Sequence, residues 1–256
     1  VIRLPRISNF TDIAPLEAVD ELDVSYVSNI SQFGDPDVVI IPGSKNTISD
    51  LLWMRQNGLE GKILRHAAKG GIVFGICGGY QMLGQSISDP TGAEQKGTVR
   101  GMGLLPVTTV FEQEKRRTRV SGRFAKVGGA LAEMSGVCYE GYEIHMGRTV
   151  LSKGTVPLVY MEEEGEQRQD GAQSDHVYGC YMHGIFDMSE TVKTFLAAVL
   201  RKKGIDPSKI TVRDRNAYKE EQYDRLASIV RENLNMEAVY KIIEKGNEAS
   251  CSLLSE

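Results

Sequence analysis

Residues 72–84 read Ile-Val-Phe-Gly-Ile-Cys-Gly-Gly-Tyr-Gln-Met-Leu-Gly, an apolar run that ends in Gly-x-Cys-Gly-Gly. The apolar run predicts a buried strand, and the residues after Cys77 predict a short helix. A tight turn from strand to helix strains the backbone, so it requires small neighbours, which Gly75, Gly78 and Gly79 supply. The stretch therefore predicts an α/β sheet with Cys77 at its carboxyl edge, in the position of a nucleophile.

The same alternation of strands and helices precedes this stretch. A second apolar run, residues 38–41, predicts another central strand, and apolar residues at helical spacing predict two short helices that stop near Gly58 and Gly70. We expect a doubly wound, mostly parallel sheet of the flavodoxin-like type. From about residue 97 to 171 the sequence is β-rich, which predicts antiparallel strands that extend the sheet, with a hairpin around 119–127.

The carboxy-terminal part of the chain returns to helical periodicity. A helix is predicted after Ser189, and a charged but periodic tail follows in which Tyr223, Leu226 and Ile229 share one stripe. We predict one α/β domain over residues 1–205 and a helical extension over 206–256 that packs on it.

Composition excludes several classes of partner. The 256 residues carry 30 basic and 34 acidic side chains, a net charge of −4, without a long run of either sign. Nucleic acid and membrane surfaces are therefore not expected partners. No apolar stretch approaches the ~18 residues of a spanning helix.

The four cysteines, Cys77, Cys138, Cys180 and Cys251, are widely and irregularly spaced. They resemble neither a disulfide framework nor a paired metal site, so a reducing, cytoplasmic compartment is expected. The chain begins at Val1, without an initiator methionine, in what reads as a strand. We therefore expect it to be part of a longer protein.

The candidate chemistry centres on Cys77. A helix amino terminus favours an anionic sulfur, and its free N–H groups, beginning at Gly78, can receive an oxyanion. The alternative is that Cys77 is a small buried apolar residue among glycines that pack a strand on a helix. A thiol nucleophile also needs a base, and the chain has four histidines.

His183 is the preferred base, because it follows an apolar strand and precedes a glycine turn. His145 is its rival, since Tyr142, Glu143 and His145 gather polar groups beside flexible glycines. His66 belongs to a helical pattern and is expected on a solvated helix face, and His176 is expected to be an ordinary strand residue. Cys180-x-x-His183 lacks a second ligand pair, so no metal site is expected.

Residues 42–47, Pro-Gly-Ser-Lys-Asn-Thr, follow the strand 38–41 and also lie at a strand's carboxyl end. Their backbone, at Gly43 or Ser44, is a candidate second oxyanion donor. A phosphate-binding loop is excluded, because Lys45 is followed by asparagine and the glycine spacing is wrong. Independent ATP binding by this domain is unsupported.

Together, residues 42–47, 75–84, 141–147 and 182–186 resemble the glutaminase domain of the cobyric acid synthase family, and so do the opening residues 1–12. The likeness covers nearly the whole chain. The Gly-x-Cys-Gly-Gly element alone indicates only the wider class I glutamine amidotransferase superfamily, and the other segments narrow it to the cobyric and cobyrinic acid amidases.

The resemblance implies an activity and a set of residues. Cys77 would attack the side-chain amide of glutamine, and His183 would activate the thiol and protonate the departing ammonia, leaving a glutamyl thioester that water hydrolyses. The oxyanion and glutamine-binding group implied by the resemblance is Gly43, Ser44, Gly78, Gln81, Tyr142, Glu143 and His145.

The resemblance also implies partners outside this domain. No cofactor is expected here; ATP and magnesium would bind an amino-terminal synthetase domain. That domain would use the ammonia to amidate four peripheral carboxylates of adenosylcobyrinic acid a,c-diamide on the route to cobalamin.

One position departs from the wider superfamily. There, a glutamate two residues after the histidine orients the imidazole, and here that position is Ile185. Asp187 or Glu143 would have to reach the histidine, or a Cys-His dyad suffices. Two other functions stay open: the glutaminase partner of a cell-wall (lipid II) amidating ligase, which has a similar elbow and lacks the third acid, and a noncatalytic docking domain of the same fold.

Overall fold

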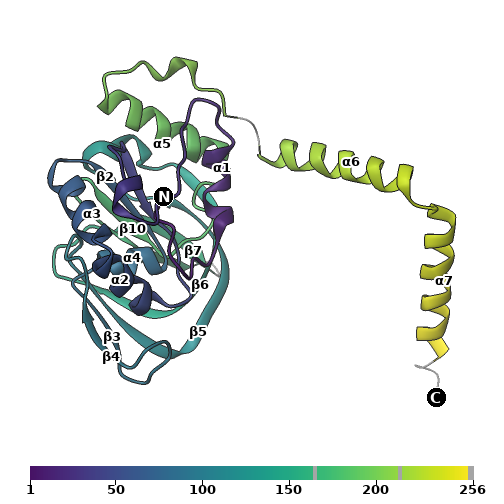
Figure 1. Cartoon of the computed structure of the whole chain (residues 1–256), viewed down its shortest axis with the longest axis horizontal. Coiled ribbons are helices and arrows are strands. Elements are labelled where there is room, and N and C mark those ends of the chain that lie inside the picture. Colours follow the sequence, from purple (N-terminus) through teal and green to yellow (C-terminus); the bar gives the residue numbers. More distant parts are fainter. Residues whose placement is uncertain (164–165, 213–214, 253–256) are drawn as a thin grey trace. The chain divides into compact units, whose positions relative to one another are not determined.

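The computed structural model describes residues 1–163, 166–212 and 215–252. They divide into two compact units, Val1–Val212 and Arg213–Glu256 (Figure 1). The first unit thus extends seven residues past the predicted boundary at 205. The packing of the carboxy-terminal extension on the first domain stays a prediction.

The first unit alternates strands and helices up to residue 83 and is β-rich afterwards. Its strands are β1 (Val38–Ile41), β2 (Ile72–Ile76), β3 (Ser86–Asp89), β4 (Gly97–Arg100), β5 (Val107–Phe124), β6 (Cys138–Leu151), β7 (Val159–Glu163), β8 (Glu166–Asp170), β9 (Ala172–Ser174) and β10 (Val177–Cys180). Its helices are α1 (Ala14–Glu17), α2 (Thr47–Gln56), α3 (Leu59–Ala68), α4 (Gly78–Leu83) and α5 (Ser189–Lys202), with 3-10 turns at Phe10–Asp12, Ile30–Gln32, Gly129–Met134 and Pro207–Lys209.

A four-stranded sheet in the order β1-β2-β10-β9 positions the candidate site. β1, β2 and β10 run parallel, and β9 is antiparallel to β10. Every residue of β2 is buried, as its uninterrupted apolar sequence predicts. Phe74 of β2 lies 6.4 Å from the ring of Phe195 on α5, so this helix packs on the sheet. The predicted α/β fold is confirmed.

The antiparallel strand β9 extends the first sheet, as predicted, while the other β-rich residues form a second sheet in which, among the described strands, only β3 and β5 pair in parallel. Its order is β4-β3-β5-β7-β8, with β6 paired to β5, and β5 and β6 form the long strand pair labelled in Figure 1. The predicted hairpin around 119–127 is wrong, since β5 continues to Phe124. The glycine at 122 marks a close approach and not a turn: a Cβ there would lie 2.1 Å from the carbonyl oxygen of Tyr160 on β7.

The second unit consists of α6 (Arg215–Asn233) and α7 (Met236–Ser252), so the predicted helical extension is confirmed. Large apolar side chains on both helices are exposed, among them Tyr223, Leu226, Ile229, Tyr240 and Ile242. Among the described residues of the chain, no helix has the length and apolar character needed to cross a bilayer.

Candidate active site

Cys77 stands at the turn between β2 and α4 in a strained backbone conformation. Its φ of +52° and ψ of −108° lie outside the regions that side chains favour. The turn is fixed on both sides, because the Cys77 N–H donates to the Cys180 carbonyl at 2.8 Å and the Cys77 carbonyl accepts from Gln81 N–H at 3.1 Å. These two hydrogen bonds hold the strained turn, so the thiol lies at the carboxyl edge of the sheet, as predicted from the sequence.

The loop after β1, residues 42–46, lies against the start of α4; we call it the oxyanion loop. A Cβ built on Gly78 would be 2.9 Å from the backbone nitrogen of Ser44, so only glycine permits this approach. The first N–H groups of a helix have no intrahelical acceptor. The approach brings together two of the predicted oxyanion donors, the backbones of Gly78 and Ser44. Gly43 lies next to the base, because a Cβ on it would be 2.8 Å from Cε1 of His183.

His183 follows β10, the strand beside β2, and its imidazole is near enough to the Cys77 thiol for that thiol to raise its pKa. The thiol itself lies 3.8 Å from the Ile144 carbonyl oxygen on β6. Its backbone is tied to β6 by two hydrogen bonds with Tyr142, of 2.9 and 3.1 Å. The Tyr142 ring stacks on the imidazole with centroids 5.3 Å apart and planes at 19°. His183 is 1% exposed, so almost none of its surface reaches bulk solvent.

The carboxylate that orients His183 belongs to Asp12. The Nδ1–H of His183 donates to Asp12 Oδ2 at 2.7 Å, and both side chains are 1% exposed. Asp12 Oδ1 accepts from Gly184 N–H at 2.9 Å and from Asn9 Nδ2 at 3.3 Å. Neither Glu143 nor Asp187, the two carboxylates considered from the sequence, is this partner. Cys77, His183 and Asp12 form the geometry of a Cys-His-Asp triad.

The surroundings of His183 favour its charged form. Burial works against the imidazolium, but the hydrogen bonds and charges of Asp12 and Cys77 outweigh it and raise the pKa of His183 to about 10. With Nδ1 held by Asp12, Nε2 is the ring nitrogen left for proton transfer with the sulfur. His183 Nε2 and the Cys77 sulfur can therefore exchange a proton.

Glu143 serves an ion-pair cluster instead of the base. It is fully buried, with Oε2 at 2.6 Å from Arg168 Nη2 and 3.1 Å from Arg116 Nε. Although burial would raise the pKa of Glu143, its contact with His145 and the charges of both arginines lower it. The carboxylate stays ionised and anchors β6.

His145 is held by Tyr181 and by the backbone of its own strand. Its ring stacks on Tyr181 with centroids 3.7 Å apart, and its Nδ1 lies 2.8 Å from the Gly147 carbonyl. Cys77 raises the pKa of His183, the preferred candidate, while these contacts engage the ring of its rival.

Gln81 lies on α4 one turn after Cys77 and is 2% exposed. Its Nε2 donates to the Tyr181 hydroxyl at 3.0 Å, and its Oε1 accepts from Thr47 Oγ1 at 3.2 Å. Both ends of the amide are thus engaged within the protein. Sequence reasoning missed Thr47 and Tyr181, which hold Gln81, and Asn9, which donates to the Tyr142 hydroxyl.

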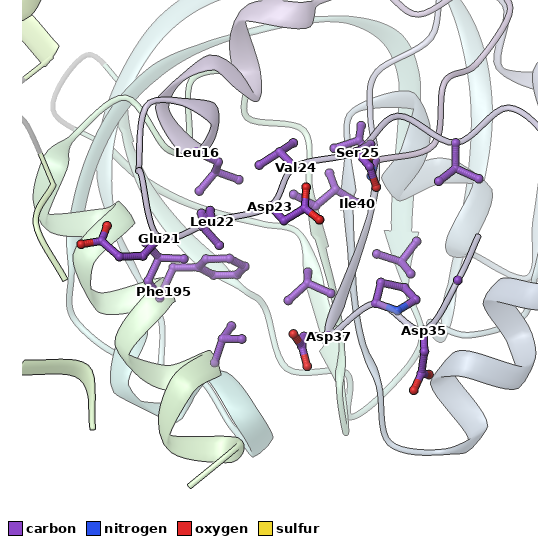
Figure 2. Close-up of a pocket in the computed structure, with 18 of the residues that line it drawn as sticks. Leu16, Glu21, Leu22, Asp23, Val24, Ser25, Asp35, Asp37, Ile40 and Phe195 are labelled. Atoms are coloured by element: carbon purple, nitrogen blue, oxygen red, sulfur yellow. The ribbon is translucent and has the colours of Figure 1, made fainter. Parts of the chain in front are cut away.

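A cavity of about 610 Å³ lies elsewhere in the first unit, between β1, α5 and residues 21–37. Figure 2 shows its apolar lining, including Leu22, Val24 and Phe195, and the acidic side chains of Glu21 and Asp23 beside them. None of the residues predicted for the site lines it. The site at Cys77 is a separate feature of the molecule.

The triad geometry agrees with a family assignment. The family model of the CobB/CobQ-like glutamine amidotransferase domain matches residues 1–191. The chain belongs to this family. It is accordingly a glutamine amidotransferase domain, and the resemblance seen in the sequence is confirmed.

Two curated relatives are cobyric acid synthases. That of Ruminiclostridium cellulolyticum is 52% identical over 252 residues, which are 97% of this chain and 49% of the relative. That of Lachnoclostridium phytofermentans is 44% identical over 256 residues, covering 96% of this chain and 50% of the relative. The chain therefore spans about half the length of the curated relatives it matches.

A solved structure supports the fold independently. A chain in the structure of PurLQS from Thermotoga maritima superimposes with a TM-score of 0.58 at 17% identity, covering 79% of this chain and 96% of that one. At this identity the likeness concerns the architecture alone.

Proposed function

We propose that this chain is the glutaminase part of a cobyric acid synthase, which releases ammonia from glutamine for ATP-dependent amidation. The observation that carries the proposal is the alignment of Cys77, His183 and Asp12 at the carboxyl edge of the parallel sheet. The names and identities of the curated relatives support the acceptor chemistry. They also disfavour the alternative of a lipid II amidating ligase.

The reaction follows from the positions of these groups. His183 Nε2 takes the thiol proton, and the Cys77 sulfur attacks the side-chain carbonyl carbon of glutamine. The carbonyl oxygen becomes an oxyanion that the N–H groups of Gly78 and the oxyanion loop receive. The imidazolium then returns its proton to the amide nitrogen, the C–N bond breaks, and ammonia leaves a glutamyl thioester.

The second half of the reaction reverses the roles. A water molecule gives a proton to His183 as it attacks the thioester, and the resulting tetrahedral intermediate collapses to glutamate and the Cys77 thiol. Throughout, Asp12 keeps Nδ1 protonated, so Nε2 alternates between base and acid.

The remaining predicted residues shape the glutamine pocket. We assign Tyr142 to one wall of it, because its ring covers the face of His183. Glu143 and His145 stabilise the same strand from the protein interior. Gln81 acts through Tyr181 and Thr47, whose hydroxyls its amide bonds.

We assign the other reactants to the half of the relatives that this chain does not span. ATP, magnesium and the corrinoid acceptor, adenosylcobyrinic acid a,c-diamide, would bind the synthetase domain, and this domain would need no cofactor. A reducing cytoplasmic compartment is also proposed, supported by the free thiols of Cys77, Cys138 and Cys180.

Glutamate release from glutamine by the 256-residue chain tests the proposal. We expect Cys77→Ala to abolish it and a glutamine-analogue electrophile to label Cys77 alone. Labelling of Cys138 or Cys180, or wild-type turnover in Cys77→Ala, would show that the assignment is wrong. A folded chain with an inert Cys77 thiol would instead favour the noncatalytic docking domain.

A further inference from the structure

The oxyanion loop is held from behind by a buried carboxylate. Asp50, in the first turn of α2, is 0% exposed, and its Oδ2 accepts a hydrogen bond from Ser44 Oγ at 2.7 Å. Ser44 Oγ in turn accepts from the Asn46 N–H at 3.0 Å. The side chain of Ser44 is thus bonded on two sides, and the backbone nitrogen of the same residue is the one beside Gly78.

Arg6 offsets the charge of this carboxylate. Its backbone N–H donates to Asp50 Oδ2 at 3.2 Å, and its Nη1 lies 3.6 Å from Oδ1. Burial raises the pKa of Asp50, while the bonds from Ser44 and Arg6 and the charge of Arg6 oppose that rise. A carboxylate with no exposed surface needs such partners to stay ionised.

The same amino-terminal segment reaches both parts of the site. The Lys45 N–H donates to the Arg6 carbonyl at 2.8 Å, and the Ser8 N–H donates to the Gly43 carbonyl at 2.9 Å, so residues 6–8 bridge to the oxyanion loop. Four residues further on, Asp12 holds His183. Two buried carboxylates thus contact the two parts of the site. Asp12 binds the base, His183, and Asp50 binds Ser44 in the oxyanion loop.

We propose that Asp50 is a positioning residue for glutamine hydrolysis: with Arg6 as its counter-charge, it fixes Ser44 so that the backbone N–H groups of Ser44 and Gly78 converge on the oxyanion. This inference rests on the proposed function. Asp50 acts through Ser44 and does not touch the substrate. Its loss should therefore impair the steps that build an oxyanion and leave the nucleophile unchanged.

The test measures oxyanion stabilisation and the reactivity of the Cys77 nucleophile separately in the 256-residue chain. In Asp50→Asn we expect kcat for glutamine hydrolysis to fall about 10- to 100-fold with KM changed less than about threefold, since one lost oxyanion donor costs up to about 10³-fold. The rate of Cys77 alkylation by iodoacetamide should stay near the wild-type rate, because alkylation forms no oxyanion at a carbonyl. The matched control is Glu60→Gln, which breaks the surface ion pair with Arg55 on the neighbouring helices and should leave both rates unchanged.

Ser44→Ala is the second variant, since it removes the hydroxyl that Asp50 holds and keeps the backbone N–H. We expect about a tenfold loss of kcat with normal alkylation, and this variant decides the matter if Asp50→Asn does not fold. An unchanged kcat in Ser44→Ala, or parallel losses of kcat and alkylation in a folded Asp50→Asn, would overturn the inference. Failure of the proposed function looks different: the wild-type chain would release no glutamate, or Cys77→Ala would still release it.

Discussion

At the scale of single residues, the position of His183 depends on one carboxylate. Asp12 accepts the Nδ1–H and so selects the tautomer that presents Nε2 to the sulfur. We expect Asp12→Asn to reduce kcat for glutamine hydrolysis by about 10²- to 10⁴-fold, because the amide allows the wrong tautomer. Steady-state glutamate release measures it. Asp187→Asn is the matched control, and a larger loss there than in Asp12→Asn would contradict the assignment of Asp12.

The pKa of His183 also predicts how stability depends on pH. The folded value of about 10 lies above the ordinary value of 6.5, so the folded protein binds this proton more tightly than the unfolded chain. The resulting stabilisation is complete below pH 6.5 and is lost as the pH rises through about 10. We expect Asp12→Asn to lower the free energy of unfolding by about 3–5 kcal/mol at pH 6 and by less at pH 10. Urea unfolding at both pH values checks this, and equal losses would contradict it.

The sequence identified only part of this triad, for a physical reason. Cys77 and His183 each follow an apolar strand and precede a glycine, and local patterns of that kind are visible in one chain. Asp12 lies 171 residues from His183 and meets it only through the tertiary fold. Asp187 follows the histidine closely and Glu143 belongs to a polar cluster beside glycines, whereas no local pattern marks Asp12. Arg6 and Asp50 are 44 residues apart, so their contact also forms only through the tertiary fold.

At the scale of elements, the close approach of two strand backbones explains why the hairpin predicted around 119–127 is wrong. The predictions of strands 38–41 and 72–76 are confirmed, because a strand buried on both faces has a continuous apolar sequence that can be recognised. Residue 122 lies in the stretch predicted to form a hairpin, whereas β5 runs through it beside β7. A glycine required by a neighbouring strand looks the same in sequence as a glycine required by a turn.

This explanation makes a prediction for Gly122. A Cβ there would lie 2.1 Å from the Tyr160 carbonyl oxygen, and backbone cannot move aside cheaply. We expect Gly122→Ala to lower the free energy of unfolding by about 1–3 kcal/mol, as overpacking does. Chemical denaturation measures it. Gly128→Ala is the control: its φ is −102° and the nearest atom to a new Cβ is 3.8 Å away, so its effect should stay within about 0.5 kcal/mol. Equal effects of the two variants would refute the close-approach explanation.

At the scale of the whole molecule, the described site residues and the carboxy-terminal helices belong to different units. Every residue that holds Cys77, His183, Asp12 or the oxyanion loop lies within Val1–Val212. Residues 213–256 can therefore be removed as a test of what the second unit contributes. We expect the chain 1–212 to hydrolyse glutamine with kcat and KM within about twofold of the full chain, since substitutions remote from a site usually have small effects.

The exposed side chains of the second unit give the truncation a second readout. Tyr223, Leu226 and Ile229 of α6 are 60%, 58% and 49% exposed, and they recur every three residues along one stripe. Large apolar patches of this kind on a water-facing surface mark association sites. We expect the 256-residue chain to self-associate with rising concentration in sedimentation velocity and the chain 1–212 to stay monomeric. Tyr223→Ser with Leu226→Ser in the full chain should reproduce the truncation, whereas equal sedimentation of all three proteins would contradict the prediction.

A lower thermal midpoint of the first unit after truncation would instead support the packing predicted from the sequence, because helices that cover a domain stabilise it by burying apolar surface.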